Sequence, residues 1–171
     1  PPRYRSSAAS DVYKRQQPPV LASVILEIVK NGDEYDLKKS QSLFNSIMAY
    51  HEWFFSARDP NNEGFLSIIH PWESGRDNCP DWDLGLKKVN IPEDFEEYLR
   101  CDTSHVEVSQ RPTNEDYDKF MSIVQYGKNC NWDPLNMYNH GPFLAIDPGI
   151  NFIFLKANKD LLSLSLIHIS E

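Results

Sequence analysis

The sequence predicts an all-α fold in which helical hairpins flank one long loop. Apolar residues recur at every third or fourth position over residues 20–29, 37–55, 117–124 and 150–161. Residues 66–112 show little periodicity and are rich in proline, tryptophan and aspartate, and no segment alternates convincingly between apolar and polar residues. An α-helical barrel or toroid fits these observations, and so does a plain helical bundle, because periodicity alone does not distinguish them.

The first two helices are expected to pack as an antiparallel hairpin. Pro18 and Pro19 stand where the first helix begins, and Asn31-Gly32 is a typical helix end. A second apolar repeat covers about residues 36–57 after a short turn. Two helices joined so closely normally pack side by side.

Two more helices are predicted after the long loop. Thr113 and Asp116 form a possible capping pair at the start of a helix that continues to about Cys130. A turn around residues 132–142 then leads to a last helix, which Asp147-Pro148 caps. One face of this last helix is apolar up to Leu161, as expected for a helix that packs on a core.

Both ends of the chain match translated sequencing-library adapter. Residues 6–16, SSAASDVYKRQ, back-translate without mismatch to a transposase adapter that ends in GATGTGTATAAGAGACAG. Residues 164–171, LSLIHISE, back-translate to a sequence that begins CTGTCTCTTATACACATC, the reverse complement of that end. We therefore expect residues 1–16 and 164–171 to be artefacts of library preparation, flanking a partial domain at residues 17–163.

Charge and composition exclude several classes of partner. The formal net charge is −8, and removing the two ends takes away four basic and two acidic residues, which makes it −10. An acidic chain with no basic cluster is not expected to bind nucleic acid or an anionic membrane surface. No apolar run approaches the roughly 18 residues of a membrane span. A small neutral ligand is expected instead, and nothing in the sequence indicates an oligomeric state.

Cysteines and histidines indicate neither a disulfide framework nor a metal site. The three cysteines are odd in number and lack CxxC spacing, which favours a reduced, cytoplasmic protein, although a signal peptide would be lost with a missing N-terminus. The histidines of residues 17–163 lack metal-ligand spacing, so we expect no catalytic metal and no cofactor. Residues 58–64, RDPNNEG, weakly resemble a calcium loop, but His70 stands where that loop needs a bidentate glutamate.

Residues 70–83, HPWESGRDNCPDWD, are the candidate for chemistry. They hold four carboxylates and two tryptophans in fourteen positions. Tryptophan faces stack on pyranose rings, carboxylates bind sugar hydroxyls, and a protonated carboxyl can donate to a glycosidic oxygen. Composition alone leaves open an acidic loop that is merely solvated.

This segment resembles the HPWESG-DNSP-WD signature of the mannosylglycerate hydrolase group in glycoside hydrolase family 63, and its ESG-D core resembles the trehalase motif. Gln17-Pro18-Pro19 is similar to the family's TQPP helix start, and residues 58–64 are similar to its RDPDGDG turn. Residues 117–161 also follow the family pattern, with YDKFMSIV, PFLAIDPGINFIF and KANKDLL in order. The resemblance covers essentially all of residues 17–162.

The resemblance implies an (α/α)6 barrel that hydrolyses a small α-glucoside or α-mannoside with inversion. In that chemistry a carboxylic acid protonates the leaving oxygen while a second carboxylate, roughly 6.5–9.5 Å away, activates water. Asp77 matches the family's general acid, and Glu73 is the rival for that role. The matching substrate-binding positions are Trp72, Glu73, Asn78, Trp82, Asp83 and Gln17. A non-catalytic carbohydrate-binding or scaffold protein on the same barrel is the alternative.

The resemblance also implies that part of the machinery lies outside residues 17–163. The family's general base is a glutamate nearer the C-terminal end of the barrel, so no residue here matches it, and we expect this segment alone to be inactive and poorly behaved. Two residues depart from the signature, Cys79 where serine is common and Asp81 where a basic or neutral residue is common. The extra negative charge of Asp81 is expected to disfavour an anionic aglycone such as glycerate.

Overall fold

The computed structural model of the chain describes residues 18–100 and 111–169, without the side chains of residues 34–37 and 168–169. It is mostly helical, and its described residues include two strands of two residues each, β1 (Ser67–Ile68) and β2 (Ala145–Ile146), which pair with each other. The predicted all-α class is therefore confirmed. Strands this short leave no alternation in the sequence from which they could be predicted.

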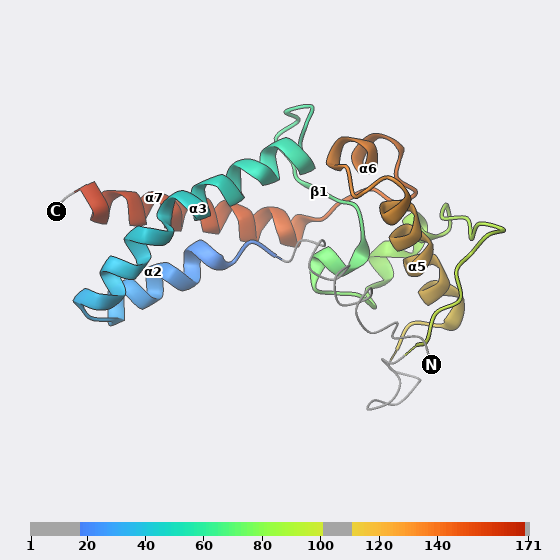
Figure 1. The fold of residues 1–171 in the computed structure, drawn as a ribbon, viewed down its shortest axis with the longest axis horizontal. Coiled ribbons are helices and arrows are strands. Elements are labelled where there is room, and N and C mark those ends of the chain that lie inside the picture. Colours follow the sequence, from blue (N-terminus) through green and yellow to red (C-terminus); the bar gives the residue numbers. More distant parts are fainter. Residues whose placement is uncertain (1–17, 101–110, 170–171) are drawn as a thin grey trace. The chain divides into compact units, whose positions relative to one another are not determined.

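The chain divides into two compact units. Among the described residues, unit 1 comprises 67–145 and unit 2 comprises 18–66 with 146–169. In Figure 1 unit 2 is the group of long helices α2, α3 and α7.

Unit 2 contains the predicted hairpin. Helix α2 (Leu21–Asn31) and helix α3 (Glu34–Arg58) follow one another after a short turn and pack together. Helix α7 (Pro148–Ile169), far away in sequence, lies alongside both of them (Figure 1). Side chains from the three helices form one buried cluster: Ala22, Ile47, Ala157 and Leu161, with Ile25 and Phe44 packed against it.

A polar contact also joins α3 to α7. His51 of α3 is 3% exposed, and its Nδ1 lies 2.7 Å from Oδ1 of Asn158 on α7. A carboxamide oxygen only accepts, so the His51 ring carries its proton on Nδ1. The bond fixes the register of α3 against α7 in addition to the apolar cluster.

The turn after α3 is stabilised by a buried carboxylate. Asp59 is 5% exposed, and its two side-chain oxygens accept the main-chain N–H groups of Glu63 (2.7 Å) and Gly64 (2.9 Å). Asn62 and Gly64 have positive φ angles, +56° and +84°, which asparagine and glycine tolerate well. Backbone turn formation thus accounts for the pattern that resembles a calcium loop.

Unit 1 contains helix α5 (Asn114–Asn129) and a series of short elements: the 3₁₀ turns η1 (Pro71–Ser74) and η2 (Pro80–Trp82), then α4 (Asp83–Leu86) and α6 (Pro134–His140). The predicted cap of α5 is confirmed, because Oγ1 of Thr113 accepts the N–H of Asp116 at 3.2 Å. The short helices α4 and α6 were not predicted, since four and seven residues are too few for periodicity to show.

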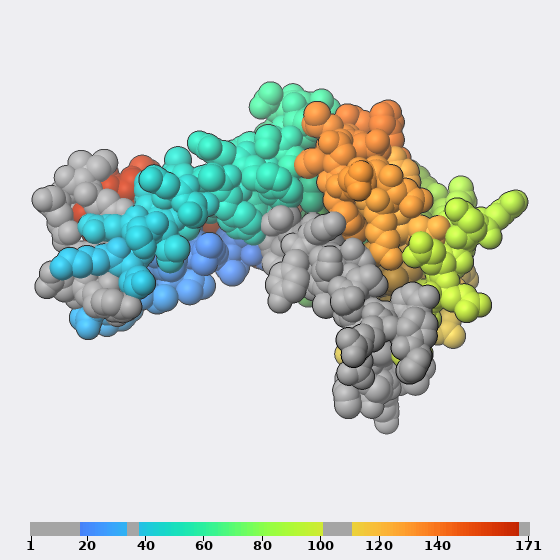
Figure 2. Space-filling model, viewed as in Figure 1, coloured from blue at the N-terminus to red at the C-terminus, as the bar shows by residue number. Residues whose placement is uncertain are grey.

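Apolar side chains remain exposed on all the long helices of unit 2. They include Val20, Leu21, Val24 and Ile28 at α2, Leu43, Met48 and Phe55 on α3, and Phe152, Leu155, Leu162 and Leu166 on α7. Helix α3, teal in Figure 2, forms much of the face of unit 2 seen there. Within the described ranges, no helix is long and apolar enough to cross a membrane.

Helix α7 continues without a break through Leu164, which is fully buried. Residues 164–169 are apolar enough to extend a helix whether they were encoded by a genome or by an adapter. The helical geometry therefore does not bear on their origin, which stays a prediction.

Candidate active site

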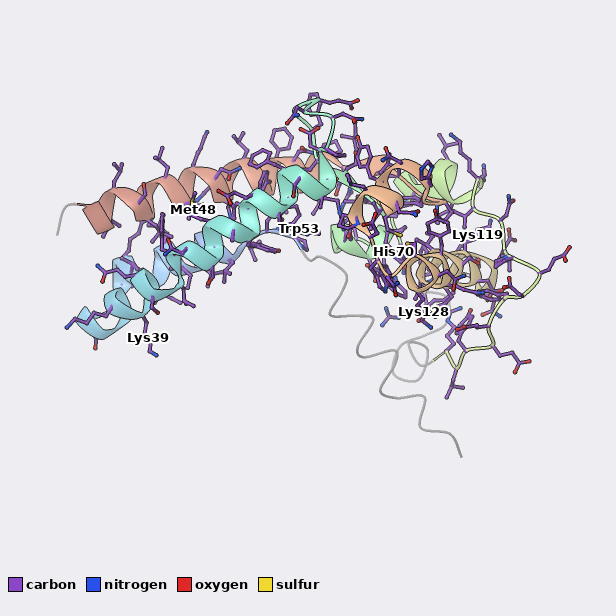
Figure 3. All side chains as sticks on the ribbon, turned by 45° about the horizontal axis from the view of Figure 1, so that its top comes forward. Lys39, Met48, Trp53, His70, Lys119 and Lys128 are labelled. Carbon is purple, nitrogen blue, oxygen red and sulfur yellow. The ribbon has the colours of Figure 1, made fainter. Side chains whose placement is uncertain are left out.

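His70 anchors the loop of residues 70–83 to α5. It is fully buried, and its Nε2–H donates to the main-chain oxygen of Phe120 at 3.1 Å, while its Nδ1 accepts the N–H of Trp72 at 3.1 Å. A carbonyl oxygen only accepts and a main-chain N–H only donates, so the ring proton lies on Nε2. Figure 3 labels His70 among the side chains of unit 1.

Glu73 is also one of the buried residues that support the loop. It is 3% exposed, and its Oε2 accepts the N–H of Ile69 at 3.0 Å. Its own N–H donates to the oxygen of His70 at 3.0 Å, which closes η1. These contacts fit the interpretation in which Glu73 orients the loop, whereas the rival role of general acid needs a carboxyl that can reach the substrate.

The next three residues turn the chain outward. Oγ of Ser74 donates to the oxygen of Pro71 at 2.7 Å and accepts the N–H of Arg76 at 3.0 Å. Gly75 ends η1 with φ +70°, a left-handed conformation that favours glycine. The ESG sequence is thus explained by a buried carboxylate, a turn hydroxyl and a left-handed glycine.

Asp77 and Asn78, the predicted acid and its neighbour, lie at the outer end of this turn. Both are exposed to solvent. The main-chain N–H of Cys79 donates to the oxygen of Arg76 at 3.1 Å, so the two residues sit inside a closed turn. The structure therefore presents Asp77 from a short, constrained loop.

The two tryptophans of the loop have different environments. Trp72 is half-buried, and its ring centroid lies 4.5 Å from that of His70, 5.7 Å from Phe120 and 5.9 Å from Tyr117. Trp82 is 3% exposed, donates from Nε1 to the oxygen of Arg76 at 2.8 Å, and packs edge-on against Phe143. Trp72 keeps surface on which a sugar could stack, whereas Trp82 supports the loop from beneath.

Of the other predicted site residues, Asp83 is exposed and begins α4. Gln17 lies outside the described residues. The structure thus brings Trp72, Asp77, Asn78 and Asp83 to exposed or half-exposed positions of one loop, with Glu73 and Trp82 buried under it.

Three loop residues that the sequence analysis did not connect contact one another. Nη1 of Arg76 lies 3.2 Å from Oδ2 of Asp81 and 3.4 Å from Sγ of Cys79, and the Cys79 thiol donates to the same Asp81 oxygen at 3.1 Å. The hydrogen bond from Cys79 and the ion pair with Arg76 hold the pKa of Asp81 below its ordinary value. Asp81 is therefore ionised at neutral pH, and its charge is balanced by Arg76.

A second group was also missed. Tyr98 stacks on Tyr117, with centroids 5.5 Å apart and rings 27° from parallel, and the guanidinium of Arg100 lies 4.5 Å from the Tyr117 centroid. The Tyr98 hydroxyl donates to Oδ1 of Asp118 at 2.5 Å. Burial, and then this hydrogen bond, raise the pKa of Tyr98. No periodic signal marks residues 95–100, so this aromatic group, which adjoins Trp72 through Tyr117, follows only from the fold.

Comparison with known proteins bears out the resemblance. The family model described as the mannosylglycerate hydrolase MGH1-like glycoside hydrolase domain matches residues 4–168. The match extends into both ends that we expect to be adapter-derived.

The relatives are named for glycerate-linked sugars. The mannosylglycerate hydrolase of Thermus thermophilus is 39% identical over 153 residues, which is 88% of this chain and 37% of the relative. Mannosylglycerate hydrolase MGH1 of Selaginella moellendorffii is 36% identical over 151 residues, 87% of this chain and 31% of the relative. A glucosylglycerate hydrolase of Mycolicibacterium hassiacum is 34% identical over 112 residues, 65% of this chain and 25% of the relative.

Solved structures of this family are similar to the chain. The crystal structure of the family 63 mannosylglycerate hydrolase of Thermus thermophilus in complex with Tris and D-glycerate has a TM-score of 0.86 and 38% identity, over 90% of this chain and 38% of that one. The fold is accordingly part of an (α/α)6 barrel, as the resemblance implied. The chain spans between about a quarter and two fifths of the length of these relatives. It belongs to the mannosylglycerate hydrolase MGH1-like family of glycoside hydrolases.

Proposed function

We propose that the protein containing this chain hydrolyses a small α-glycoside of glycerate, with a mannosyl or glucosyl group, by an inverting mechanism in which Asp77 is the general acid. The observation that carries the proposal is that Asp77 and Asn78 lie on an exposed turn. The residues that support this turn, His70 and Glu73, are buried and hydrogen-bonded. A catalytic group must be held in place while it remains accessible to the substrate.

In the proposed reaction, the Asp77 carboxyl gives its proton to the glycosidic oxygen as the bond to the sugar breaks. Water attacks the sugar carbon from the opposite face and loses its proton to a second carboxylate. We propose that this base is a glutamate outside residues 17–163, and we assign it to no residue of this chain. We propose that the substrate is contacted by Trp72, Asn78, Asp83 and Gln17. Glu73 and Trp82 are proposed to support the loop that carries Asp77.

The ion pair in the loop removes an objection to an anionic leaving group. Asp81 alone would repel the carboxylate of glycerate, but Arg76 lies 3.2 Å from it, so the pair carries no net charge. The expectation that Asp81 disfavours glycerate therefore no longer follows. The relatives named for mannosylglycerate and glucosylglycerate support glycerate as the aglycone.

The test uses the complete protein, with hydrolysis of mannosylglycerate and glucosylglycerate measured as release of free glycerate. We expect Asp77→Asn to lower kcat at least about a hundredfold, because a positioned general acid contributes roughly 10²–10⁴. Sugar binding, measured by calorimetry, should change little. The matched control is Asp94→Asn, an exposed aspartate of the same unit, which should keep full activity.

Three results would contradict the proposal in different ways. Activity of Asp77→Asn above a few per cent of wild type would remove Asp77 from the acid role. Turnover of other α-glycosides with none of either glycerate compound would reject the substrate class. Sugar binding by the wild-type protein without any turnover would favour the non-catalytic carbohydrate-binding alternative.

We also propose a cytoplasmic location. Cys79 and Cys130 are free thiols in the structure, as expected for a reducing compartment. Cys101 lies outside the described residues. Finding the complete protein in the extracellular fraction of its source would overturn this location.

A further inference from the structure

We propose that Arg76 and Asp81 form a clamp that positions the acid Asp77, so that both are positioning residues for the proton-donating step. The inference rests on the proposed function and adds to it two residues whose side chains need not touch the substrate.

The clamp closes the turn on its outer side. Arg76 precedes Asp77, and Asp81 lies four residues after it. The ion pair between them is 3.2 Å long, and the Cys79 thiol contacts both partners, at 3.4 Å from Nη1 of Arg76 and 3.1 Å from Oδ2 of Asp81. The side chains at positions 76, 79 and 81 therefore form one connected group, whose members flank Asp77 and Asn78 in the sequence.

Arg76 also connects this group to the buried side chain of Trp82. Its main-chain oxygen accepts from the N–H of Cys79 at 3.1 Å and from Nε1 of Trp82 at 2.8 Å. Its guanidinium lies 5.3 Å from the Trp82 ring centroid, and Trp82 is packed against Phe143. Arg76 is thus attached to a buried ring through its backbone and its side chain at once.

The sequence context makes the pairing informative. Positions 76 and 81 are the two open positions in the signature HPWESG-DNSP-WD, and Cys79 replaces its serine. In this chain the open positions carry opposite charges that contact each other. The charges at the two positions therefore compensate each other within the turn.

The effect of the clamp should be on geometry and not on stability. The Arg76 and Asp81 side chains are 45% and 63% exposed, and exposed ion pairs add little to folding free energy. A catalytic group displaced by about 1 Å can nevertheless lose about a hundredfold in rate. Loosening one side of the turn should displace Asp77 by a fraction of that distance.

The experiment measures kcat and KM of the complete protein with Arg76→Met and Asp81→Asn, which keep side-chain size and remove the charges. Each is expected to lower kcat about tenfold, with KM within about twofold of wild type and an unchanged melting temperature. The swapped double variant Arg76→Asp/Asp81→Arg should recover at least about a third of the wild-type kcat. Glu115→Gln, which breaks the Lys119–Glu115 pair of α5 at its exposed glutamate, is the control and should leave kcat unchanged.

A pH profile separates positioning from a direct electrostatic effect on Asp77. The two single variants remove opposite charges, so an electrostatic effect would move the alkaline limb of the profile in opposite directions. Positioning lowers kcat in both variants and leaves that limb in place. Opposite shifts of the limb, or a double variant no better than the poorer single one, would overturn the proposal.

The proposed function and the clamp fail in distinguishable ways. If the wild-type protein hydrolyses no glycoside, the proposed function and the clamp are both rejected. A wild-type protein that is active and depends on Asp77, but whose Arg76→Met and Asp81→Asn variants keep full kcat, rejects the clamp alone. A raised KM with unchanged kcat would reject it too, because the pair would then bind substrate instead of positioning the acid.

Discussion

Replacing His70 by alanine should loosen the loop of residues 70–83. His70 is fully buried and links η1 to α5, because its Nδ1 accepts the N–H of Trp72 in η1 and its Nε2–H donates to the oxygen of Phe120 in α5, each at 3.1 Å. Alanine removes both bonds, leaves the N–H of Trp72 without its acceptor, and creates a cavity against Phe120, whose ring centroid lies 5.7 Å from that of His70.

The magnitude follows from these losses. A hydrogen bond between neutral groups contributes about 1 kcal/mol net, and a buried N–H left unsatisfied costs roughly 1–3 kcal/mol. The lost contacts of a ring-sized side chain cost about 2 kcal/mol more when the site does not collapse. The expected destabilisation is therefore about 4–6 kcal/mol.

Two assays on the complete protein measure this effect. Urea unfolding should show a lower midpoint with the slope unchanged, and hydrogen exchange should become faster at the amides of residues 70–76 before it does so in unit 2. His140→Ala is the matched control, because His140 is exposed at the end of α6. A destabilisation below about 1 kcal/mol, or loop exchange as slow as in the wild type, would refute the argument that His70 anchors the loop.

Three further predictions concern unit 2 and the ends of the chain. Burial acts to raise the pKa of Asp160, but hydrogen bonds from Lys156 and Ser23 hold this pKa below the ordinary value of 3.8. The stabilising effect of the carboxylate is therefore complete above that pH and is lost as the pH falls through the lower folded pKa. Asp160→Asn should cost about 1 kcal/mol at pH 7 and progressively less as the pH falls below 3.8, and a cost that does not change with pH would contradict this. Purified residues 17–163 should bind the dye ANS strongly through exposed side chains such as Val24 and Phe152 and should show no hydrolysis, so detectable turnover would show that no external base is needed. Long-read sequencing of the source gene should diverge from this sequence at residues 1–16 and 164–171, whereas a genome that encodes both segments would reject their adapter origin.

The helices that could be predicted are those with enough length for periodicity or with a local cap. The hairpin of α2 and α3 follows from apolar spacing, and the start of α5 follows from Thr113 and Asp116. Helix α6 was missed although Asp133-Pro134 repeats the Asp-Pro signal that predicted α7, and the Asp133 side chain does cap it by accepting the N–H of Asn136 at 2.7 Å. The cap alone marks the start of this helix, because its seven residues are too few for an apolar periodicity to show.

The candidate loop was found from its motif, but the burial of its residues could not be. Trp72 and Trp82 look alike in the sequence, and only the fold shows that the second is enclosed by Phe143 while the first keeps exposed surface. The pair of Arg76 and Asp81 could not be predicted either. Residues five apart face each other here because Gly75 and the turn at residues 76–79 redirect the chain, and no regular periodicity describes that path.

The loop of residues 70–83 consists of buried supporting residues and an exposed turn, and this division decides how a general acid can be identified in it. His70, Glu73 and Trp82 are residue types that act in catalysis or bind sugars, yet each is buried and hydrogen-bonded inside the loop. Substituting any of them should lower activity by disordering the turn that carries Asp77. Loss of activity at these positions therefore does not identify the proton donor. Only an isosteric change at an exposed carboxyl, with the loop shown intact by hydrogen exchange, separates the acid from the residues that hold it.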